Sequence, residues 1–217
     1  MNRKPLPVCL LESRIQALTQ SLMIWDLPSA VRAIQIAPGG GQCLSLTAPW
    51  PRLLLALALP TGTTAQLHVV AVKRQGPLQL SSPLFHAPFM DFNVDGRFAV
   101  GDWLPEEIDP RSISTIEAQL FAHHFSVVLH ERTLRPDGMA TGAAINSYHH
   151  GRAWRELSRS DLPRFPGRYL VSRKQTLNGW LQSLDQLTEL SDMTIGIDDE
   201  RAARSSPAAL RLVQTGR

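Results

Sequence analysis

Four short apolar segments, each bounded by turns rich in proline or glycine, constrain the fold of this 217-residue chain more than any other feature. They span residues 31–36, 43–46, 53–59 and 67–72. Short apolar or alternating runs between such turns are typical of strands. The pattern therefore predicts an antiparallel meander of about four strands.

Apolar residues at helical spacing predict helices on both sides of this meander. One helix is expected within residues 8–24, and another near Ser114, where Glu117 three residues later completes a capping box. A short helix is expected around residues 153–157, and a longer one after Thr176, which can cap it. Helices and strands in separate stretches of the chain indicate the α+β class. The helix near Ser114 is expected to turn five residues toward the core: Ile116, Leu120, Phe121, Phe125 and Val127.

The same patterns predict the domain organisation. We expect an N-terminal helical segment over residues 1–23 and a main domain over residues 24–190. Residues 191–217 are polar with few large apolar side chains, so they are expected to form a flexible tail.

Charge and cysteine content argue against several classes of function. There are 22 Lys and Arg against 19 Asp and Glu, and a net charge of +3 attracts nucleic acid or anionic lipid only weakly. The most apolar run, residues 53–59, is far shorter than the ~20 residues of a membrane-spanning helix. Cys9 and Cys43 stand apart, so neither a disulfide framework nor a zinc site is expected. With no export signal, the expected location is the cytoplasm, without nucleic-acid or membrane partners.

Three motifs suggest chemistry that their surroundings do not support. The run Gly39–Gly41 lacks the Gly-Lys-Ser/Thr signature of a phosphate loop, so a hairpin turn is favoured. No Gly-x-Ser-x-Gly is present, which disfavours a serine hydrolase. Five histidines lack metal-binding spacing, so no metal and no other cofactor is expected. They are His123, His124, His130, His149 and His150.

The chain reads Pro83-Leu84-Phe85-His86-Ala87-Pro88, then Asp91, then Asp95-Gly96-Arg97-Phe98-Ala99-Val100-Gly101. This order resembles the active-site loop of a bacterial branch of the ubiquitin-conjugating fold, the prokaryotic ubiquitin-conjugating-like family D. Members of that family typically read Pro-Leu-Tyr-His-Ala-Pro, then Asn, then Asp-Gly-Arg-Val-Cys-Leu-Gly. The likeness continues in the same order over roughly residues 24–185. It implies the ubiquitin-conjugating (UBC-like) α+β fold.

The resemblance places Ala99 where the family has its catalytic cysteine. Alanine has no nucleophilic atom and cannot carry a thioester. Asp91 replaces the family's asparagine, and its charge would oppose a developing oxyanion. The family's histidine near the end of the next helix falls on Val127, with His124 or His130 as substitutes. These three differences predict a naturally inactive member of the family.

The resemblance therefore implies a binding or scaffold subunit in a bacterial ubiquitin-like conjugation pathway. The expected partners are a ubiquitin-like protein, its ThiF-type activating enzyme, or a catalytically active relative. The expected contact surface lies around position 99, with His86 nearby, and comprises Phe89, Met90, Asp91, Phe98, Ala99 and Trp103. Simple packing of the loop on the core is an equal alternative for Phe98 and Trp103.

Two other hypotheses remain for the chemistry. The chain could be an active carrier enzyme in which cysteine was changed to alanine at position 99. Another nucleophile, such as Ser126 or Cys43, could also replace the missing thiol, although Cys43 falls in a predicted strand and is expected to be a small buried residue.

Overall fold

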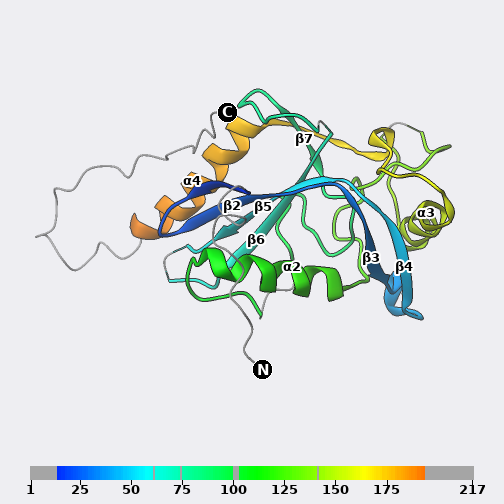
Figure 1. The fold of residues 1–217 in the computed structure, drawn as a ribbon, viewed down its shortest axis with the longest axis horizontal. Helices are drawn as coiled ribbons and strands as arrows, with labels where there is room; N and C mark the ends of the chain where they lie inside the picture. The colour runs from blue at the N-terminus through cyan, green and yellow to red at the C-terminus, as the bar shows by residue number, and fades with distance from the viewer. Residues whose placement is uncertain (1–13, 61, 74, 100–102, 141, 194–217) are drawn as a thin grey trace, which may run out of the picture.

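Two β-sheets form the framework of the computed structural model, which describes residues 14–60, 62–73, 75–99, 103–140 and 142–193. The larger sheet has six antiparallel strands in the order β1-β2-β5-β6-β7-β9 (Figure 1). They are β1 (Ile15–Leu18), β2 (Leu22–Leu27), β5 (Arg52–Ala58), β6 (Gln66–Val72), β7 (Pro83–His86) and β9 (Ser172–Thr176). The smaller sheet has the order β4-β3-β8, with β8 parallel to β3. Its strands are β3 (Ala30–Ile36), β4 (Leu44–Trp50) and β8 (His124–Phe125).

Helices lie on both sides of the larger sheet (Figure 1). One face packs on α4 (Leu177–Met193), while α2 (Ile113–Ala122) lies on the other side and α3 (Ser147–Arg159) contacts β4. The short 3-10 turns are η1 (Pro38–Gly40), η2 (Pro110–Ser112) and η3 (Gly167–Tyr169). This arrangement confirms the α+β class, and α3 and α4 confirm the last two predicted helices.

Strand β5 shows why the central strands are apolar along their whole length. Leu53, Leu55 and Leu57 belong to the larger core, which also contains residues of α2 and α3. The intervening Leu54 and Ala56 belong to the smaller core under α4. A strand with both faces covered has no side on which polar residues reach water, so its sequence does not alternate.

The four predicted strands exist, but they do not form one meander. Residues 31–36 and 43–46 belong to the β3–β4 hairpin, and residues 53–59 and 67–72 to β5 and β6. The hairpin joins β8 in the smaller sheet, while β2 and β5 pair directly with each other. Spacing along the chain cannot distinguish a hairpin that continues a sheet from one that leaves it.

The helix predicted over residues 8–24, and with it the helical segment over residues 1–23, is wrong within the described residues. From residue 15 onward this region forms β1 and β2; residues 8–13 lie outside the described residues. In β2, Ile24 faces the smaller core and Trp25 the larger core. Both faces of β2 are therefore apolar, and apolar residues at helical spacing occur without a helix.

The capping box predicted at Ser114 is also wrong. The side chain of Asp109 accepts a hydrogen bond from the backbone N–H of Arg111 and starts η2, so that α2 already begins at Ile113. Ser112 occupies the N-cap position without a side-chain capping bond. An earlier helix start places Ser114 inside the first turn.

Glu117 is buried and joins α2 to the N-terminal strands instead of capping the helix. Its Oε1 accepts a hydrogen bond of 3.0 Å from Trp25 Nε1, and Arg14 forms an ion pair with the same oxygen. The helix ends at Ala122, so Phe125 reaches the core from β8 and Val127 is exposed. The prediction that the helix directs Val127 into the core is therefore wrong.

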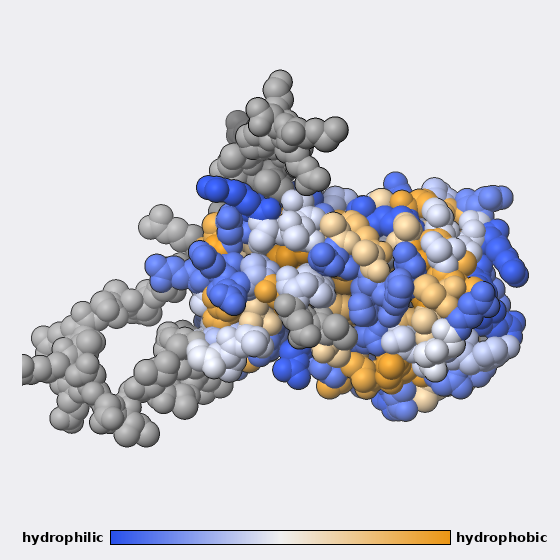
Figure 2. Space-filling view, turned by 90° about the horizontal axis from the view of Figure 1, so that it is seen from below, coloured by the Kyte–Doolittle hydropathy of each residue, from blue (hydrophilic) through white to orange (hydrophobic). Residues whose placement is uncertain are grey.

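The surface seen from the α2 side carries several small apolar areas separated by polar residues (Figure 2). Scattered apolar residues of this kind are normal for a folded domain. Among the described residues, no helix combines the length and apolar character needed to cross a membrane.

Replacing Glu117 by alanine should lower the free energy of unfolding by about 2 kcal/mol, because Trp25 Nε1 and Arg14 would lose a shared acceptor in a buried setting. Urea denaturation followed by tryptophan fluorescence measures this change. Glu107→Ala, at an exposed position outside the helix, is the matched control and should change stability by less than about 0.5 kcal/mol. Equal effects of the two substitutions would contradict this role for Glu117.

Candidate functional site

The loop after β7 extends the larger sheet along the edge of β6. Val69 N donates to Gly96 O and Phe98 N donates to Leu67 O, both at 2.8 Å. These bonds continue the edge beyond the point where β7 stops pairing at Val70. The segment leading to Ala99 is therefore held as a strand-like extension of the sheet.

Gly96 allows this close approach. Its φ is +81°, a left-handed value that favours glycine. A Cβ at this position would lie 2.8 Å from Val69 O and 2.5 Å from Arg173 Nη1. Arg173 also donates from Nη2 to Asp95 O at 3.1 Å, so β9 supports the turn from beneath.

Aromatic side chains of the loop point into the core. The ring of Phe89 stacks on Trp154 with centroids 5.3 Å apart, and Phe92 lies 5.0 Å from Phe98. Phe89, Met90, Asp91 and Phe98 are all buried. Phe89, Met90 and Asp91 thus support the loop from its buried side. Phe98, although buried, lines the same open groove as Ala99, whereas the half-buried Trp103 does not line it.

Asp91 fixes the loop to the segment that follows α2. Its carboxylate accepts hydrogen bonds from Ser126 N and Val127 N, both at 2.8 Å, and lies 3.0 Å from His123 Nε2. Its backbone N–H donates to Val127 O at 2.7 Å, and its carbonyl accepts from Ala99 N at 2.9 Å. Asp91 thus binds the segment after α2 and the end of its own loop at Ala99.

These contacts also set the ionisation of Asp91. Burial alone would raise the pKa of the carboxyl group, but the hydrogen bonds from His123, Ser126 and Val127 outweigh it and lower the pKa. Asp91 is not among the residues lining the groove beside Ala99. The structure gives the carboxylate of Asp91 a supporting role inside the loop, as the shared acceptor of these hydrogen bonds.

The histidine that meets this loop is His123, at the C-cap of α2, rather than His124 or His130. Position 127, where the resemblance placed the family's histidine, contributes its backbone N–H to Asp91. Counting along a helix fails here because α2 ends at Ala122 and the chain turns into β8. The only sequence signal for His123 was its place in the pair with His124.

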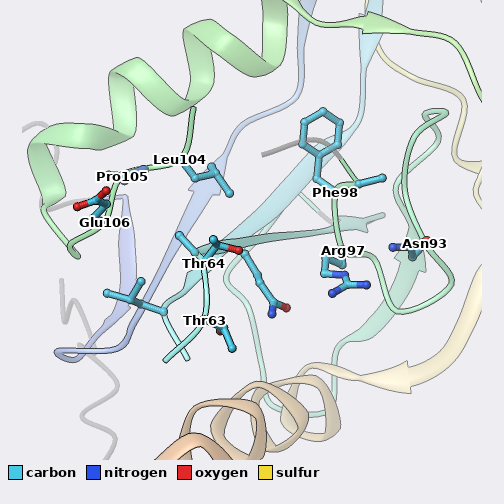
Figure 3. Close-up of a pocket in the computed structure, with 12 residues that line it drawn as sticks. Thr63, Thr64, Asn93, Arg97, Phe98, Leu104, Pro105 and Glu106 are labelled. Atoms are coloured by element: carbon cyan, nitrogen blue, oxygen red, sulfur yellow. The ribbon is translucent and has the colours of Figure 1, made fainter. Parts of the chain in front are cut away.

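Ala99 lies on the wall of an open groove with a volume of about 680 Å³ (Figure 3). Arg97 and Asn93 lie at one end of it, and Pro105 and Glu106 at the other. Thr63 and Thr64 come from the turn between β5 and β6. The groove therefore combines hydrogen-bonding side chains with apolar ones, among them Leu59, Phe98 and Leu104, and position 99 adds only a methyl group.

His86, the last residue of β7, lies beside His130, with ring centroids 4.5 Å apart, and near Arg173. Burial, together with the charges of His130 and Arg173, lowers the pKa of His86 to about 3. Burial likewise lowers the pKa of His68 to about 4, although Asp95 opposes this change. Both side chains are therefore neutral at pH 7.

The histidines singled out in the sequence do not come together as a group. His123 meets Asp91, His130 meets His86, and the buried His150 lies 3.3 Å from Thr133 Oγ1. Within the described residues, no three His, Cys, Asp or Glu side chains are placed to share a metal ion.

Cys43 departs from its expected environment. It precedes β4 at the end of the hairpin, is exposed, and lies 3.5 Å from Gln35 Oε1. The prediction of a buried residue within a strand is therefore wrong, because the strand begins one residue later. Cys43 does not line the groove beside Ala99.

Asp91→Ala should lower the free energy of unfolding by about 3 kcal/mol or more, since three donors lose their acceptor and alanine is strained at a φ of +63°. Asp91→Asn should cost about 1–2 kcal/mol, because an amide oxygen still accepts and asparagine tolerates this φ. Urea denaturation measures both. Asp95→Asn, an exposed carboxylate of the same loop, is the control and should cost less than about 1 kcal/mol. If Asp91→Asn lowered the free energy of unfolding as much as Asp91→Ala, the stabilisation would come from the negative charge of Asp91 and not from its ability to accept hydrogen bonds.

The histidine pKa values predict a loss of stability in acid. In the unfolded chain these groups take up protons below about pH 6.5, whereas in the folded protein His68 and His86 do so only near 4 and 3. Their contribution to stability is therefore complete above pH 6.5 and is lost as the pH falls from 6.5 toward these folded values. In urea denaturation at a series of pH values, His86→Gln should show a shallower loss between pH 6.5 and 4.5 than the unchanged chain. The comparison at pH 8 is the control, and identical slopes in acid would rule out a contribution from His86.

Comparison with known proteins identifies the family to which this site belongs. No curated protein and no solved structure matches the chain. A family model described as prokaryotic E2 family D matches residues 2–173. This range includes Asp91 with its hydrogen-bond partners, the groove beside Ala99, and both sheets apart from the end of β9. This match supports a role in a bacterial ubiquitin-like pathway. The chain belongs to prokaryotic E2 family D.

Proposed function

We propose that this chain is a non-catalytic member of its family that binds a ubiquitin-like protein in the groove beside Ala99. By binding it, the chain holds the ubiquitin-like protein in place for a transfer reaction in which another protein supplies the nucleophile. The proposal rests on one observation: a methyl group stands at the exposed position 99, at the end of the described segment 75–99 and on the groove. A methyl group has no lone pair with which to attack an activated carbonyl.

The groove is suited to an extended peptide. Thr63, Thr64 and Gln66 offer hydroxyl and amide groups along one side, and Asn93 and Arg97 offer N–H donors near Ala99. An extended tail has unpaired backbone groups that require such partners. The small side chain of Ala99 leaves space for the end of the tail.

The proposed partners are the ubiquitin-like protein together with its ThiF-type activating enzyme or an active conjugating relative. A chain that binds the tail without reacting with it can deliver it to one of these enzymes. The proposed site of action is the cytoplasm, where the ATP used by an activating enzyme is available.

The alternative is an active carrier whose cysteine at position 99 was changed to alanine. The observation in its favour is the intact support of the loop: Asp91, Gly96 and the buried aromatic residues hold position 99 in place without using its side chain. The two functions differ in whether position 99 is competent for transfer when it carries sulfur.

The test is to incubate the unchanged chain and Ala99→Cys with ATP, the cognate activating enzyme and its ubiquitin-like protein. Non-reducing electrophoresis detects thioesters, and size exclusion detects complexes. We expect the unchanged chain to co-elute with the ubiquitin-like protein or the enzyme without forming an adduct. Val94→Cys, which adds an exposed thiol to the same loop, controls for nonspecific reaction.

The outcomes separate the two functions. In a competent site, the sulfur introduced by Ala99→Cys would attack the thioester carbonyl on the activating enzyme and release that enzyme's thiol. A reductant-sensitive adduct on Ala99→Cys but not on Val94→Cys would favour the carrier function. An adduct on the unchanged chain, or the absence of any complex, would contradict the binding function.

A further inference from the structure

A second groove lies between the β3–β4 hairpin and α3, and it shares no lining residue with the groove beside Ala99. Its volume is about 620 Å³. The hairpin contributes Pro38, Gln42 and Leu44, and α3 contributes Tyr148, Arg155 and Arg159. Nothing in the proposed function accounts for this groove.

The second groove is positively charged, and no acidic side chain among its described lining residues balances this charge. Arg155 and Arg159 lie one helical turn apart, and none of the described residues that line the groove is a carboxylate. The nearest acidic residue on α3, Glu156, pairs with Arg152 at 2.8 Å. Like charges one turn apart destabilise a helix, so an anion bound between these two arginines would be favourable.

Arg155 carries a specific hydrogen-bond donor for such an anion. Its Nε is buried and has no hydrogen-bond partner among the described residues. A buried donor without an acceptor is unfavourable, and a guanidinium group cannot relieve this by losing its proton. Its planar array of N–H groups matches a carboxylate better than any other protein side chain.

The walls of the second groove also offer apolar and aromatic contacts to a ligand. Pro38 and Leu44 present apolar surface, and the ring of Tyr148 is 65% exposed. Tyrosine and arginine are the residue types most often responsible for affinity at protein interfaces. A ligand that uses the whole groove therefore carries apolar side chains next to its carboxylates.

The groove is fixed in shape. Gly151 lets Pro38 pack directly on α3, since a Cβ there would lie 2.5 Å from Pro38 Cγ. Gly39 N donates to Ser126 O at 3.0 Å and holds the end of the hairpin against the segment after β8. Trp154 anchors α3 in the core, where its Nε1 donates to Pro88 O at 3.1 Å. A preformed groove loses little entropy on binding.

We propose that this second groove is a docking site for an acidic peptide segment of a partner protein, with carboxylates bound by Arg155 and Arg159 and an apolar side chain placed against Tyr148, Pro38 and Leu44. Short acidic and apolar motifs in extended segments of proteins have this chemistry. The site is separate from Ala99, so it does not depend on the proposed function of that groove.

The probe is a fluorescein-labelled, amidated peptide of sequence Glu-Leu-Asp-Phe-Glu-Leu, titrated with the full chain and followed by fluorescence anisotropy. We expect saturable binding with a Kd below about 1 mM. Arg155→Gln combined with Arg159→Gln should weaken it at least about tenfold, because both guanidinium groups that donate to the peptide's carboxylates are lost. The single exposed substitution Arg159→Gln should weaken it by a smaller factor, which keeps the test valid if the double variant is unfolded by circular dichroism.

Arg152→Gln is the matched control: it removes the same charge from the same helix outside the groove, and binding should be unchanged. A peptide with Gln and Asn in place of its acidic residues should not bind. The proposal is overturned if the unchanged chain shows no saturable binding, or if Arg152→Gln weakens binding as much as Arg159→Gln. It is also overturned if a labelled oligothymidylate binds more tightly than the peptide and loses this affinity in the Arg159→Gln variant, which would identify a nucleic-acid site.

Discussion

The hydrogen bonds of Asp91 join the loop after β7 to the segment that follows α2, beside the ring contacts that Phe89, Phe92 and Phe98 make with Phe125. Through its carboxylate and its backbone N–H, Asp91 binds the segment 123–127, and through its carbonyl it binds Ala99. The same segment contains β8, which pairs with β3 of the hairpin. The loop, the end of α2 and the smaller sheet therefore form one connected unit around a single buried carboxylate. Because this residue has a φ of +63°, few other side chains could occupy the position without strain.

This arrangement separates the support of the loop from the chemistry at its exposed end. Asp91, Gly96 and the buried rings of Phe89 and Phe98 determine the path of the chain, and none of these contacts uses the side chain of Ala99. A change from a thiol to a methyl group at that position therefore removes reactivity at little structural cost. This separation agrees with the general rule that function resides in a few groups placed on a fold and not in the fold itself.

The two grooves use different parts of the architecture. The first is bounded by turns at the edge of the larger sheet, and the second by the hairpin and a helix that is anchored in the larger core. The segment after α2 touches both regions, since Asp91 binds Ser126 N while Ser126 O holds Gly39 at the end of the hairpin. The segment after α2 therefore lies between the Asp91 contacts and the hairpin, while the two grooves share no lining residue.

The sequence by itself determined the fold class, the central apolar strands, the helices α3 and α4, and the family to which the chain belongs. Each of these features depends on residues that are close together in the chain, so it can be predicted from local periodicity or from a short contiguous motif. Only the tertiary structure decided that residues 15–27 pair as strands, that the β3–β4 hairpin leaves the larger sheet, and that Phe89 and Met90 are buried beneath the loop and not exposed on it. It also decided that His123 meets Asp91 and that Arg173 supports Gly96. Each of these outcomes depends on contacts between residues far apart in the chain, where pairing and burial override the spacing of apolar residues along it.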